Sequence, residues 1–244
     1  MLDESHPASR LNSLPEGYRA LVIGAGGGIG RALCKHLRAD PRCARVQGVG
    51  RRQSPFVDFE DPASIESAAH ALQDGHPWHL LIVASGVLHR PDLRPEKRLA
   101  DLNAQAFSKV LTINTVGPAL VLRHFIPLLA RGAQARSLVG LVSAKVGSIG
   151  DNRLGGWTAY RASKAALNMV VKTTAIELAR THKALVLVAL HPGTVRTALS
   201  EPFHGQAQAR DPMEAAAQML AVMDALQPED TGSFRAYDGE VLPW

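Results

Sequence analysis

The pair Tyr160 and Lys164 has residue types and a spacing that suit proton transfer. Both residues lie in TAYRASKAALNMV, whose apolar residues recur at helical spacing. Residues four apart share one helix face, so we expect the phenol and the ammonium to lie close together. A neighbouring cation favours the phenolate and lowers the pKa of tyrosine from its usual value of about 10. The pair therefore predicts a general acid–base group, with an ordinary surface Tyr–Lys pair as the alternative.

A glycine-rich turn indicates a second chemical site. GAGGGIG ends an apolar run that begins at residue 19, and it opens a helical pattern. Glycines in such a turn let a phosphate approach the backbone, and the helix start offers free N–H groups and the positive end of a dipole. The turn predicts a dinucleotide site at Gly24, Gly28, Ile29 and Gly30, with a merely tight strand–helix turn as the alternative. No Gly-Lys-Ser or Gly-Lys-Thr follows, which excludes a P-loop.

Two arginines after the second apolar run bear on the choice of cofactor. NAD-binding domains usually carry an acidic residue here, which holds the ribose 2′-hydroxyl. This chain has Arg51 and Arg52 instead, and guanidinium groups pair with a 2′-phosphate. We therefore expect NADP(H) in preference to NAD(H), unless the arginines are simply solvated. Asp58 is either an acceptor for the adenine amino group or a polar residue at a helix entry.

Alternating strand and helix patterns supply the scaffold for these residues. Apolar runs predict strands at 19–24, 44–50, 56–59, 78–86, 137–143, 184–193 and 232–239. Helical spacing predicts helices at 28–40, 61–73, 103–131, 157–180 and 211–226. Most strands are apolar on both faces, as in a parallel sheet covered by helices. We therefore expect an α/β fold with a doubly wound parallel sheet, the Rossmann fold, whose ligands bind beyond the carboxyl ends of the strands.

The composition is that of an ordinary globular protein, with 46% apolar and 20% charged residues. The net charge of +5 is scattered and aromatic residues are only 5%, so we expect no nucleic-acid partner. No apolar run reaches the roughly 18 residues that a membrane helix needs. Residues 1–17 are polar, which predicts a mobile lead-in rather than a secretory signal, followed by one domain at 18–244. The expected location is the cytoplasm.

The cysteine and histidine patterns predict neither a disulfide nor a metal site. Cys34 and Cys43 lack CxxC spacing and are expected to be free thiols. His70, His76 and His79 are the nearest approach to a ligand set, and only the last two are close in sequence. Metal binding needs ligands that converge in space, so this segment is expected to hold no metal.

Three motifs together resemble a known enzyme family. YRASK, the glycine turn and HPGTVRT after the sixth predicted strand resemble the short-chain dehydrogenase/reductase family over about residues 18–244. GSIGDNRLGGW, YRASKAALNMV and the terminal DGEVLPW resemble, more narrowly, the branch that includes the C-factor signalling protein and the sniffer carbonyl reductase. The resemblance implies an NAD(P)-dependent oxidoreductase that acts on CH–OH or C=O groups. It also implies a homodimer or a homotetramer.

The resemblance also implies roles for individual residues. Tyr160 would give or take the proton, and Lys164 would hold the nicotinamide ribose and lower the pKa of the tyrosine. Asn114 would support a water-linked proton relay. Independently, Pro118 lacks an N–H and so frees the carbonyl of Asn114 as a water anchor, with a mere packing kink as the alternative. The residues implied beside the cofactor are Ser85, Gly86, Pro192, Gly193, Val195 and Thr197.

The residue that should orient the substrate carbonyl departs from the family pattern. The resemblance places it three residues before Gly147, where this chain has Ala144 in place of serine. Ser143 is one residue earlier and would need a bulge at the strand end to face the same side. Ser143 is the favoured candidate and Ser148 the second, because the loop before Tyr160 is long. The third alternative is that neither serine serves.

Two functions follow from these observations. The favoured one is an NADP(H)-dependent carbonyl reductase or alcohol dehydrogenase for a small molecule, in which Tyr160 delivers the proton and a serine polarises the oxygen. The alternative is a nucleotide-binding signalling or regulatory protein on the same fold, motivated by Ala144 and by the C-factor resemblance. Residues 191–212 suit a lid over cofactor and substrate, with Leu199 and Phe203 as apolar contacts, or else a surface excursion.

Overall fold

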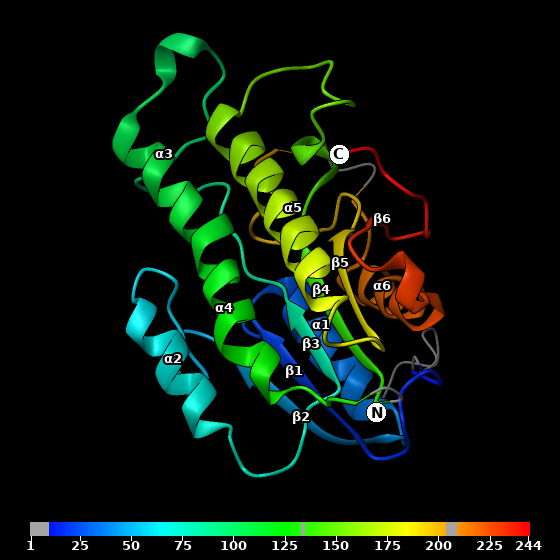
Figure 1. Cartoon of the computed structure of the whole chain (residues 1–244). Helices are drawn as coiled ribbons and strands as arrows, with labels where there is room; N and C mark the ends of the chain where they lie inside the picture. The colour runs from blue at the N-terminus through cyan, green and yellow to red at the C-terminus, as the bar shows by residue number, and fades with distance from the viewer. Residues whose placement is uncertain (1–9, 133–134, 204–208) are drawn as a thin grey trace.

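A single parallel sheet forms the centre of the molecule. The structure, a computed structural model, describes residues 10–132, 135–203 and 209–244. In this part of the chain six strands pair in the order β2–β1–β3–β4–β5–β6 (Figure 1). Their bounds are Tyr18–Ile23 for β1, Cys43–Val49 for β2, Leu80–Val83 for β3, Ser137–Val142 for β4, Leu185–His191 for β5 and Phe234–Ala236 for β6. The prediction of a doubly wound parallel sheet is confirmed.

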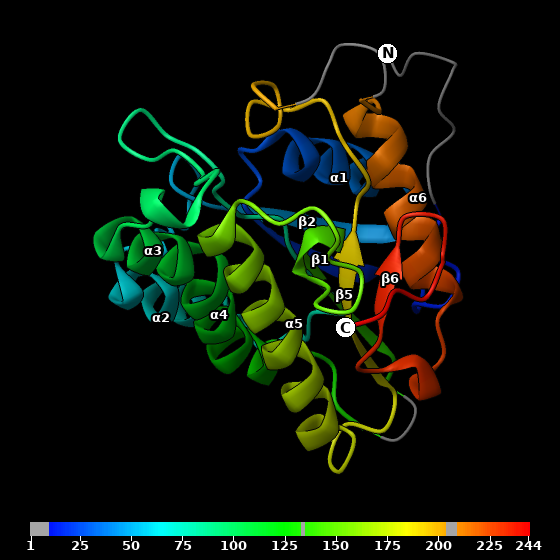
Figure 2. The same cartoon turned by 90° about the horizontal axis from the view of Figure 1, so that it is seen from above.

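Helices cover both faces of the sheet. They are α1 (Gly28–Ala39), α2 (Pro62–Ala71), α3 (Ala104–Leu111), α4 (Gly117–Phe125), α5 (Thr158–Leu178) and α6 (Pro212–Ala225). Helices α1 and α6 lie on one face, and α2, α4 and α5 lie on the other (Figure 2). Alternate strand residues face opposite sides, so Val22 enters one apolar core and Leu21 the other. No helix among the described residues is long and apolar enough to cross a membrane.

The strand order reverses between β1 and β3. Helix α1 carries the chain from β1 outward to β2, and α2 carries it back across the sheet to β3. The loops that leave the carboxyl ends of β1 and β3 therefore diverge, and such a reversal opens a crevice for ligands. The glycine turn follows β1 at this edge, and Tyr160 lies on α5 after β4.

The strand predicted at residues 56–59 is not formed. Only an isolated bridge between Asp58 and Asp61 occurs there. Val57 and Phe59 are nevertheless buried, with 3% and 6% exposure. A Cβ on Gly117 of α4 would overlap the Phe59 ring, so this ring lies directly against the helix backbone. The apolar pattern therefore reflected burial under α4 rather than pairing with β2.

The single helix predicted at residues 103–131 is interrupted. It divides into α3, a π-helical turn at Thr112–Val116, α4 and a 3-10 turn at Ile126–Leu128. In the π-helical turn the N–H of Gly117 donates to the carbonyl of Thr112. Pro118 follows at once and cannot donate to the backbone of the preceding turn. The helix is thus irregular around Asn114, where the proline predicted it.

The described part of the amino-terminal lead-in is packed, which corrects the prediction of a mobile segment through residue 17. Leu11 and Leu14 are buried, with 0% and 2% exposure, in the core beneath α1 and α6. The backbone N–H of Leu11 donates to Asp40 at 3.0 Å, and that of Ser13 donates to Asp224 of α6 at 2.8 Å. Two leucines in an otherwise polar stretch were too sparse a signal for this packing. Residues 1–9 lie outside the described part.

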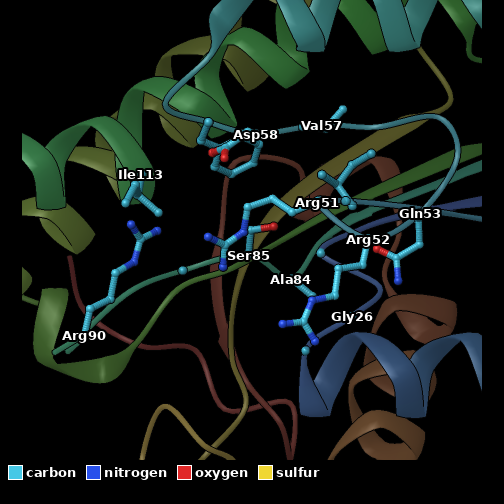
Figure 3. A pocket seen from close by; sticks show the side chains of 16 residues that line it. Gly26, Arg51, Arg52, Gln53, Val57, Asp58, Ala84, Ser85, Arg90 and Ile113 are labelled. Atoms are coloured by element: carbon cyan, nitrogen blue, oxygen red, sulfur yellow. The ribbon is translucent and has the colours of Figure 1, made fainter.

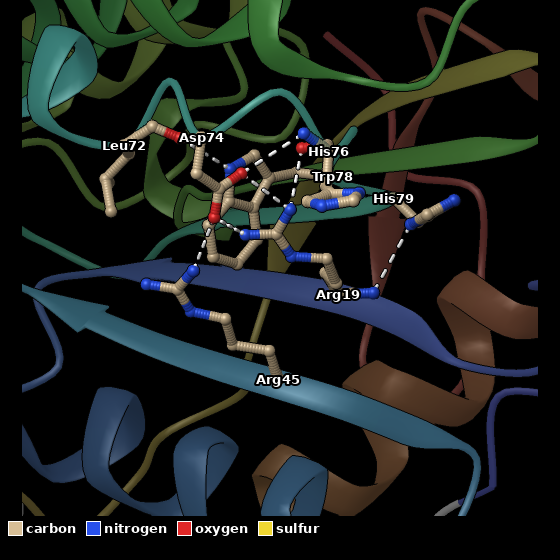
Figure 4. Close-up of polar contacts among 7 residues, drawn as sticks. All are labelled: Arg19, Arg45, Leu72, Asp74, His76, Trp78 and His79. Carbon is tan, nitrogen blue, oxygen red and sulfur yellow. Dashed lines mark hydrogen bonds and ion pairs between the residues drawn. The ribbon is translucent and has the colours of Figure 1, made fainter.

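A dense cluster of polar contacts closes the amino ends of β1 and β3. The Arg19 guanidinium donates to both carboxylate oxygens of Asp74, at 2.9 and 2.5 Å, and lies 4.0 Å from the ring centre of Trp78. Arg45 of β2 donates to the same carboxylate at 2.6 Å (Figure 4). These side chains fix the loop before β3 to β1 and β2, at the edge opposite the sequence motifs.

Candidate active site

Two cavities lie side by side beyond the carboxyl ends of the strands. The first has a volume of about 450 Å³ and lies between the glycine turn and the loops after β2 and β3. The second has a volume of about 390 Å³ and lies between the end of β4, α5 and the segment after β5. Gly27, Ala84, Ser85 and Gly86 line both cavities. The two therefore form one continuous trough from the arginines to the tyrosine.

The predicted glycines divide into packing and lining residues. Gly24 has a φ of +85°, and a Cβ there would lie 2.5 Å from Ser85 Oγ. A Cβ on Gly30 would overlap the carbonyl oxygen of Gly24, so both residues let the turn pack closely. Gly28 and Ile29 line the second cavity, and α1 begins at Gly28 without a side-chain cap. The start of α1 thus presents its first N–H groups toward the trough.

Three arginines surround the first cavity. Figure 3 shows Arg51, Arg52 and Arg90 around the same space, from the loops after β2 and β3. Arg90 is paired with Glu60 at 2.6 Å. In contrast, Arg51 and Arg52 form no ion pair with any residue that the structure describes. Two free guanidinium groups at a cavity mouth suit a ligand with a phosphate.

Polar side chains complete the lining of the first cavity. Asp58 lines it, and its Oδ1 accepts the N–H of Glu60 at 3.0 Å. Gln53 lines it as well, and its amide lies 3.4 Å from where a Cβ on Gly26 would be. The carboxylate of Asp58 therefore keeps acceptor capacity for a donor on a ligand.

Tyr160 and Lys164 come together on α5 at the floor of the second cavity. Tyr160 is 9% exposed and Lys164 is 3% exposed. The Lys164 Nζ lies 5.9 Å from the centre of the tyrosine ring and donates to the carbonyl of Val142 at 2.9 Å. Val142 is the last residue of β4, so the lysine ties the helix to the end of the central strand.

Burial governs the titration of both groups. It raises the pKa of Tyr160 to about 12, because the phenolate is poorly solvated there. It lowers the pKa of Lys164 to about 8, because the ammonium is poorly solvated too. The prediction that the neighbouring cation lowers the tyrosine pKa is therefore wrong for the protein alone. The phenol is protonated at neutral pH and is set to act as an acid.

Asn114 is fixed beside this pair by a buried hydrogen-bond set. Its side chain accepts the N–H of Val87 at 2.8 Å and donates to the carbonyl of Val87 at 2.9 Å. It also donates to Ser163 Oγ of α5 at 3.0 Å. A Cβ on Gly86 would lie 3.4 Å from Asn114 Oδ1 and 3.6 Å from Lys164 Nζ. A side chain at position 86 would therefore touch both the amide and the ammonium.

Neither candidate serine offers a free hydroxyl to the cavity. Ser143 is 2% exposed, and its Oγ donates to Asn168 Oδ1 of α5 at 2.6 Å. Ser148 is 1% exposed, and its Oγ donates to the carbonyl of Trp244 at 3.3 Å. Ala144 does line the second cavity. Ser143 lines it also, but its hydroxyl is committed to the helix rather than to the space above Tyr160.

The segment after β5 encloses the second cavity from the other side. Pro192, Gly193, Val195 and Thr197 all line it, as the family resemblance implied. A Cβ on Gly28 would lie 2.7 Å from Thr197 Cγ2, so this segment touches the glycine turn. Leu199 and Phe203 line the cavity too. Residues 204–208 of the predicted lid lie outside the described part of the chain.

The residues at the trough that the sequence patterns did not predict include two notable side chains in each cavity. Arg90 and Gln53 line the first cavity, and Trp157 and His191 line the second. Gln53 directly follows the two predicted arginines, and His191 stands in the quoted HPGTVRT, so both were within reach of the motifs. Trp157 has a left-handed backbone conformation, and the two glycines before it were the sequence signal for an unusual turn. Nothing local to Arg90 marked it, because its place depends on the loop after β3.

Comparisons with known proteins agree on one kind of relative. A family model described as enoyl-(acyl carrier protein) reductase matches residues 27–237. The 1-hydroxy-2-glutathionyl-2-methyl-3-butene dehydrogenase of Rhodococcus sp. is 32% identical over 233 residues, covering 92% of this chain and 98% of that protein. C-signal of Myxococcus xanthus is 38% identical over 146 residues, covering 60% and 83%. The crystal structure of NADPH-bound carbonyl reductase from chicken fatty liver has a TM-score of 0.82 at 26% identity, covering 95% of each chain.

Proposed function

This chain belongs to the short-chain dehydrogenase/reductase family, and from that premise we propose that it is an NADP(H)-dependent reductase of carbonyl compounds. One observation carries the proposal: a continuous trough joins two unpaired arginines, Arg51 and Arg52, to the buried pair Tyr160 and Lys164. An anionic nucleotide suits the first end, and a proton donor suits the second. The proposed acceptor is a small ketone or aldehyde.

The residues of the trough fit a dinucleotide phosphate. Gly26 and Gly27 line the first cavity without side chains, so a pyrophosphate can approach the uncapped start of α1. Arg51 and Arg52 would hold the 2′-phosphate, and Asp58 would accept the adenine amino group. Ser85, Gly86, Pro192, Gly193, Val195 and Thr197 would enclose the nicotinamide end. NADP(H) rather than NAD(H) follows from the two free guanidinium groups.

The chain's own residues supply the proton. When bound, the reduced nicotinamide supplies a hydride to the carbonyl carbon. Tyr160 gives its phenolic proton to the carbonyl oxygen, so an alcohol forms and a phenolate remains. Lys164 stabilises that phenolate by its charge, and the proton is regained from solvent along Lys164 and Asn114. Because burial raises the pKa of Tyr160 to about 12, the tyrosine carries the needed proton at every physiological pH.

The carbonyl is oriented without a serine in this proposal. The hydroxyls of Ser143 and Ser148 are bound to Asn168 and to the carbonyl of Trp244. Tyr160 is then the single hydroxyl that meets the substrate oxygen, and losing one further donor costs about 10²-fold or more in rate where such donors are present. A slow reductase is therefore expected.

The absence of a free serine hydroxyl at Ser143 and Ser148 favours a second function. A nucleotide-binding signalling protein needs the cofactor site but not a carbonyl-orienting hydroxyl, and C-signal is a partial relative. Tyr160→Phe separates the two functions in cells that depend on the protein. A phenotype that survives this substitution, but not Gly28→Val in the cofactor turn, supports signalling and contradicts the reductase.

The direct test is NADPH oxidation with a panel of ketones, aldehydes and quinones. We expect at least one substrate whose reduction stops when the protein is omitted. Binding of NADPH, measured by its fluorescence, without oxidation by any of the panel contradicts the proposal. The double variant Arg51→Ala with Arg52→Ala should bind NADPH about tenfold or more weaker and NADH unchanged. Arg38→Ala, an exposed arginine in the last turn of α1, is the matched control.

A further inference from the structure

An aromatic cluster closes the substrate side of the second cavity. The Trp157 and Phe203 rings meet edge-to-face, with centres 5.2 Å apart and an angle of 70°. His89 meets Phe203 in the same way at 5.3 Å, and Trp157 meets Tyr160 at 6.4 Å. The three residues Trp157, Phe203 and His89 come from three different loops, after β4, β5 and β3. Trp157 and Phe203 line the cavity beside the phenol that gives the proton.

The backbone of Trp157 is specialised to hold its ring there. Trp157 is the only residue other than glycine with positive φ in the described chain, at φ +52° and ψ +44°. Such a conformation is unfavourable for a bulky side chain, and it persists only where the surroundings impose it. Gly155 and Gly156 before it also have positive φ, and the Trp157 N–H donates to the carbonyl of Glu96 at 2.6 Å. The Glu96 carboxylate in turn accepts the N–H of Ala159 at 3.3 Å, so one loop fixes the whole start of α5.

The cavity beneath the cluster has no free charge for an ionic substrate. Among its described lining residues, Lys164 and His191 are the only basic side chains, and there is no acidic one. Lys164 is bound to the carbonyl of Val142. Burial, together with the nearby Lys145, lowers the pKa of His191 to about 4, so this ring is neutral at physiological pH. The remaining large lining residues include Leu88, Val146 and Leu199.

We propose that this aromatic cluster selects compact, uncharged carbonyl compounds whose C=O is conjugated to a flat ring, with Trp157 as the specificity-determining residue. Aromatic rings attract one another through edge-to-face and offset contacts beyond their burial of area. A flat ring on Trp157 and Phe203 would set its carbonyl beside the Tyr160 phenol. The proposal rests on the proposed reductase only for what happens after binding. It disfavours a glutathionyl compound such as that in the relative's name, because the described lining residues of this cavity include no unpaired cation for the two carboxylates of glutathione.

Binding tests the proposal without requiring turnover. Acetophenone and acetylcyclohexane share one carbon skeleton and differ in ring saturation, so their affinities for the NADP⁺ complex can be compared by calorimetry. Trp157→Asn removes the ring, and asparagine tolerates the left-handed backbone. We expect the preference for acetophenone to fall about fivefold in Trp157→Asn and to return in Trp157→Phe. An equal loss for both ketones, or an unchanged preference, overturns the proposal.

Controls and kinetics separate this proposal from the reductase. Leu154→Asn, 91% exposed in the same loop, should leave both affinities unchanged. Phe203→Leu removes the second ring but keeps an apolar side chain, and it should also lower the preference, which covers the event that Trp157→Asn does not fold. If acetophenone is bound selectively but never reduced, the reductase function fails and the selectivity stands. If the ratio of kcat/KM for acetophenone to kcat/KM for acetylcyclohexane is the same in wild type and in Trp157→Asn, the proposed selectivity fails and the reductase function stands.

Discussion

The two ends of the sheet differ in how completely their charged groups are paired. At the amino ends, Asp74 binds Arg19 and Arg45, and the Arg19 guanidinium also lies on the Trp78 ring. At the carboxyl ends, Arg51 and Arg52 have no ionic partner among the described residues. The arginines of the amino edge are paired within the protein, and two arginines of the carboxyl edge are not.

Two buried cations show the same contrast. Arg19 donates to a carboxylate and to the carbonyl of His76, so its charge is compensated. Lys164, 3% exposed, has one backbone carbonyl.

The amide nitrogen of Asn168 and Nδ1 of His191 are buried without a hydrogen-bond partner in the described chain. Buried atoms without a partner also occur at the amino edge, at Arg42 Nε, Ser137 Oγ and His182 Nε2, so such atoms do not distinguish the two edges. The contrast therefore rests on the charged groups, whose ion pairs contribute stability at the amino edge and which we expect to bind a ligand at the carboxyl edge.

Trp78→Ala disrupts the packing at the amino ends of the strands and should have the largest effect on the free energy of unfolding. Trp78 is fully buried and donates to the carbonyl of Leu72 at 3.4 Å. Its loss should lower the free energy of unfolding by about 3–5 kcal/mol, measured by urea unfolding. Trp244→Ala, at a residue 39% exposed, should cost much less. A fall in kcat beyond the loss of folded protein would mean that the two edges are not separate.

Lys164→Met tests the carboxyl edge of the sheet. It should stabilise the protein and abolish most of the proposed activity. Burial lowers the pKa of Lys164 from its usual value of 10.5 to about 8, so protonating it costs the folded protein stability. The variant's advantage should therefore grow as the pH falls from about 10 to 8 and level off below that, reaching about 3 kcal/mol. Lys172→Met, on the exposed side of the same helix, is the matched control for the loss of a lysine from α5. Thermal unfolding across this pH range decides the matter.

Asp74→Asn tests the ion pairs of the amino edge and should have the smallest effect on stability. The Arg19 guanidinium bonded to this carboxylate holds the pKa of Asp74 well below its usual range. Its contribution is therefore present above the ordinary pKa of about 4 and is lost as the pH falls toward the lowered value. Wild type should exceed the variant in stability at pH 7, and the gap should shrink below pH 4. A gap that is constant from pH 7 to pH 3 would contradict the ionic role.

Sequence reasoning succeeded where one segment decides the outcome. Apolar runs on both faces predicted the parallel sheet, and the order of the glycine turn, Tyr160 and the segment after β5 predicted that they meet at one edge, where they line the second cavity. The run at residues 56–59 misled, because Val57 and Phe59 are buried under α4 rather than paired in the sheet. In a run of only four residues, an apolar pattern does not distinguish a buried loop from a paired strand.

The local sequence around Gly147 could not decide which serine, if any, orients the substrate carbonyl. The side-chain direction of Ser143 depends on Asn168, 25 residues away on α5, which accepts its hydroxyl. The pKa of Tyr160 was also misjudged, because spacing reveals a neighbouring lysine and not the depth of burial around both groups. Arg90 and Trp157 joined the trough through loops whose paths no periodicity encodes.

The central claim is that Tyr160 gives the proton at a site completed by NADPH. Its most direct test is a single turnover of NADPH-loaded protein with an accepted ketone, comparing wild type with Tyr160→Phe. We predict a rate lowered by about 10²- to 10⁴-fold with unchanged NADPH affinity and unchanged unfolding temperature. A Tyr160→Phe protein that reduces the ketone within about threefold of wild type would contradict the account.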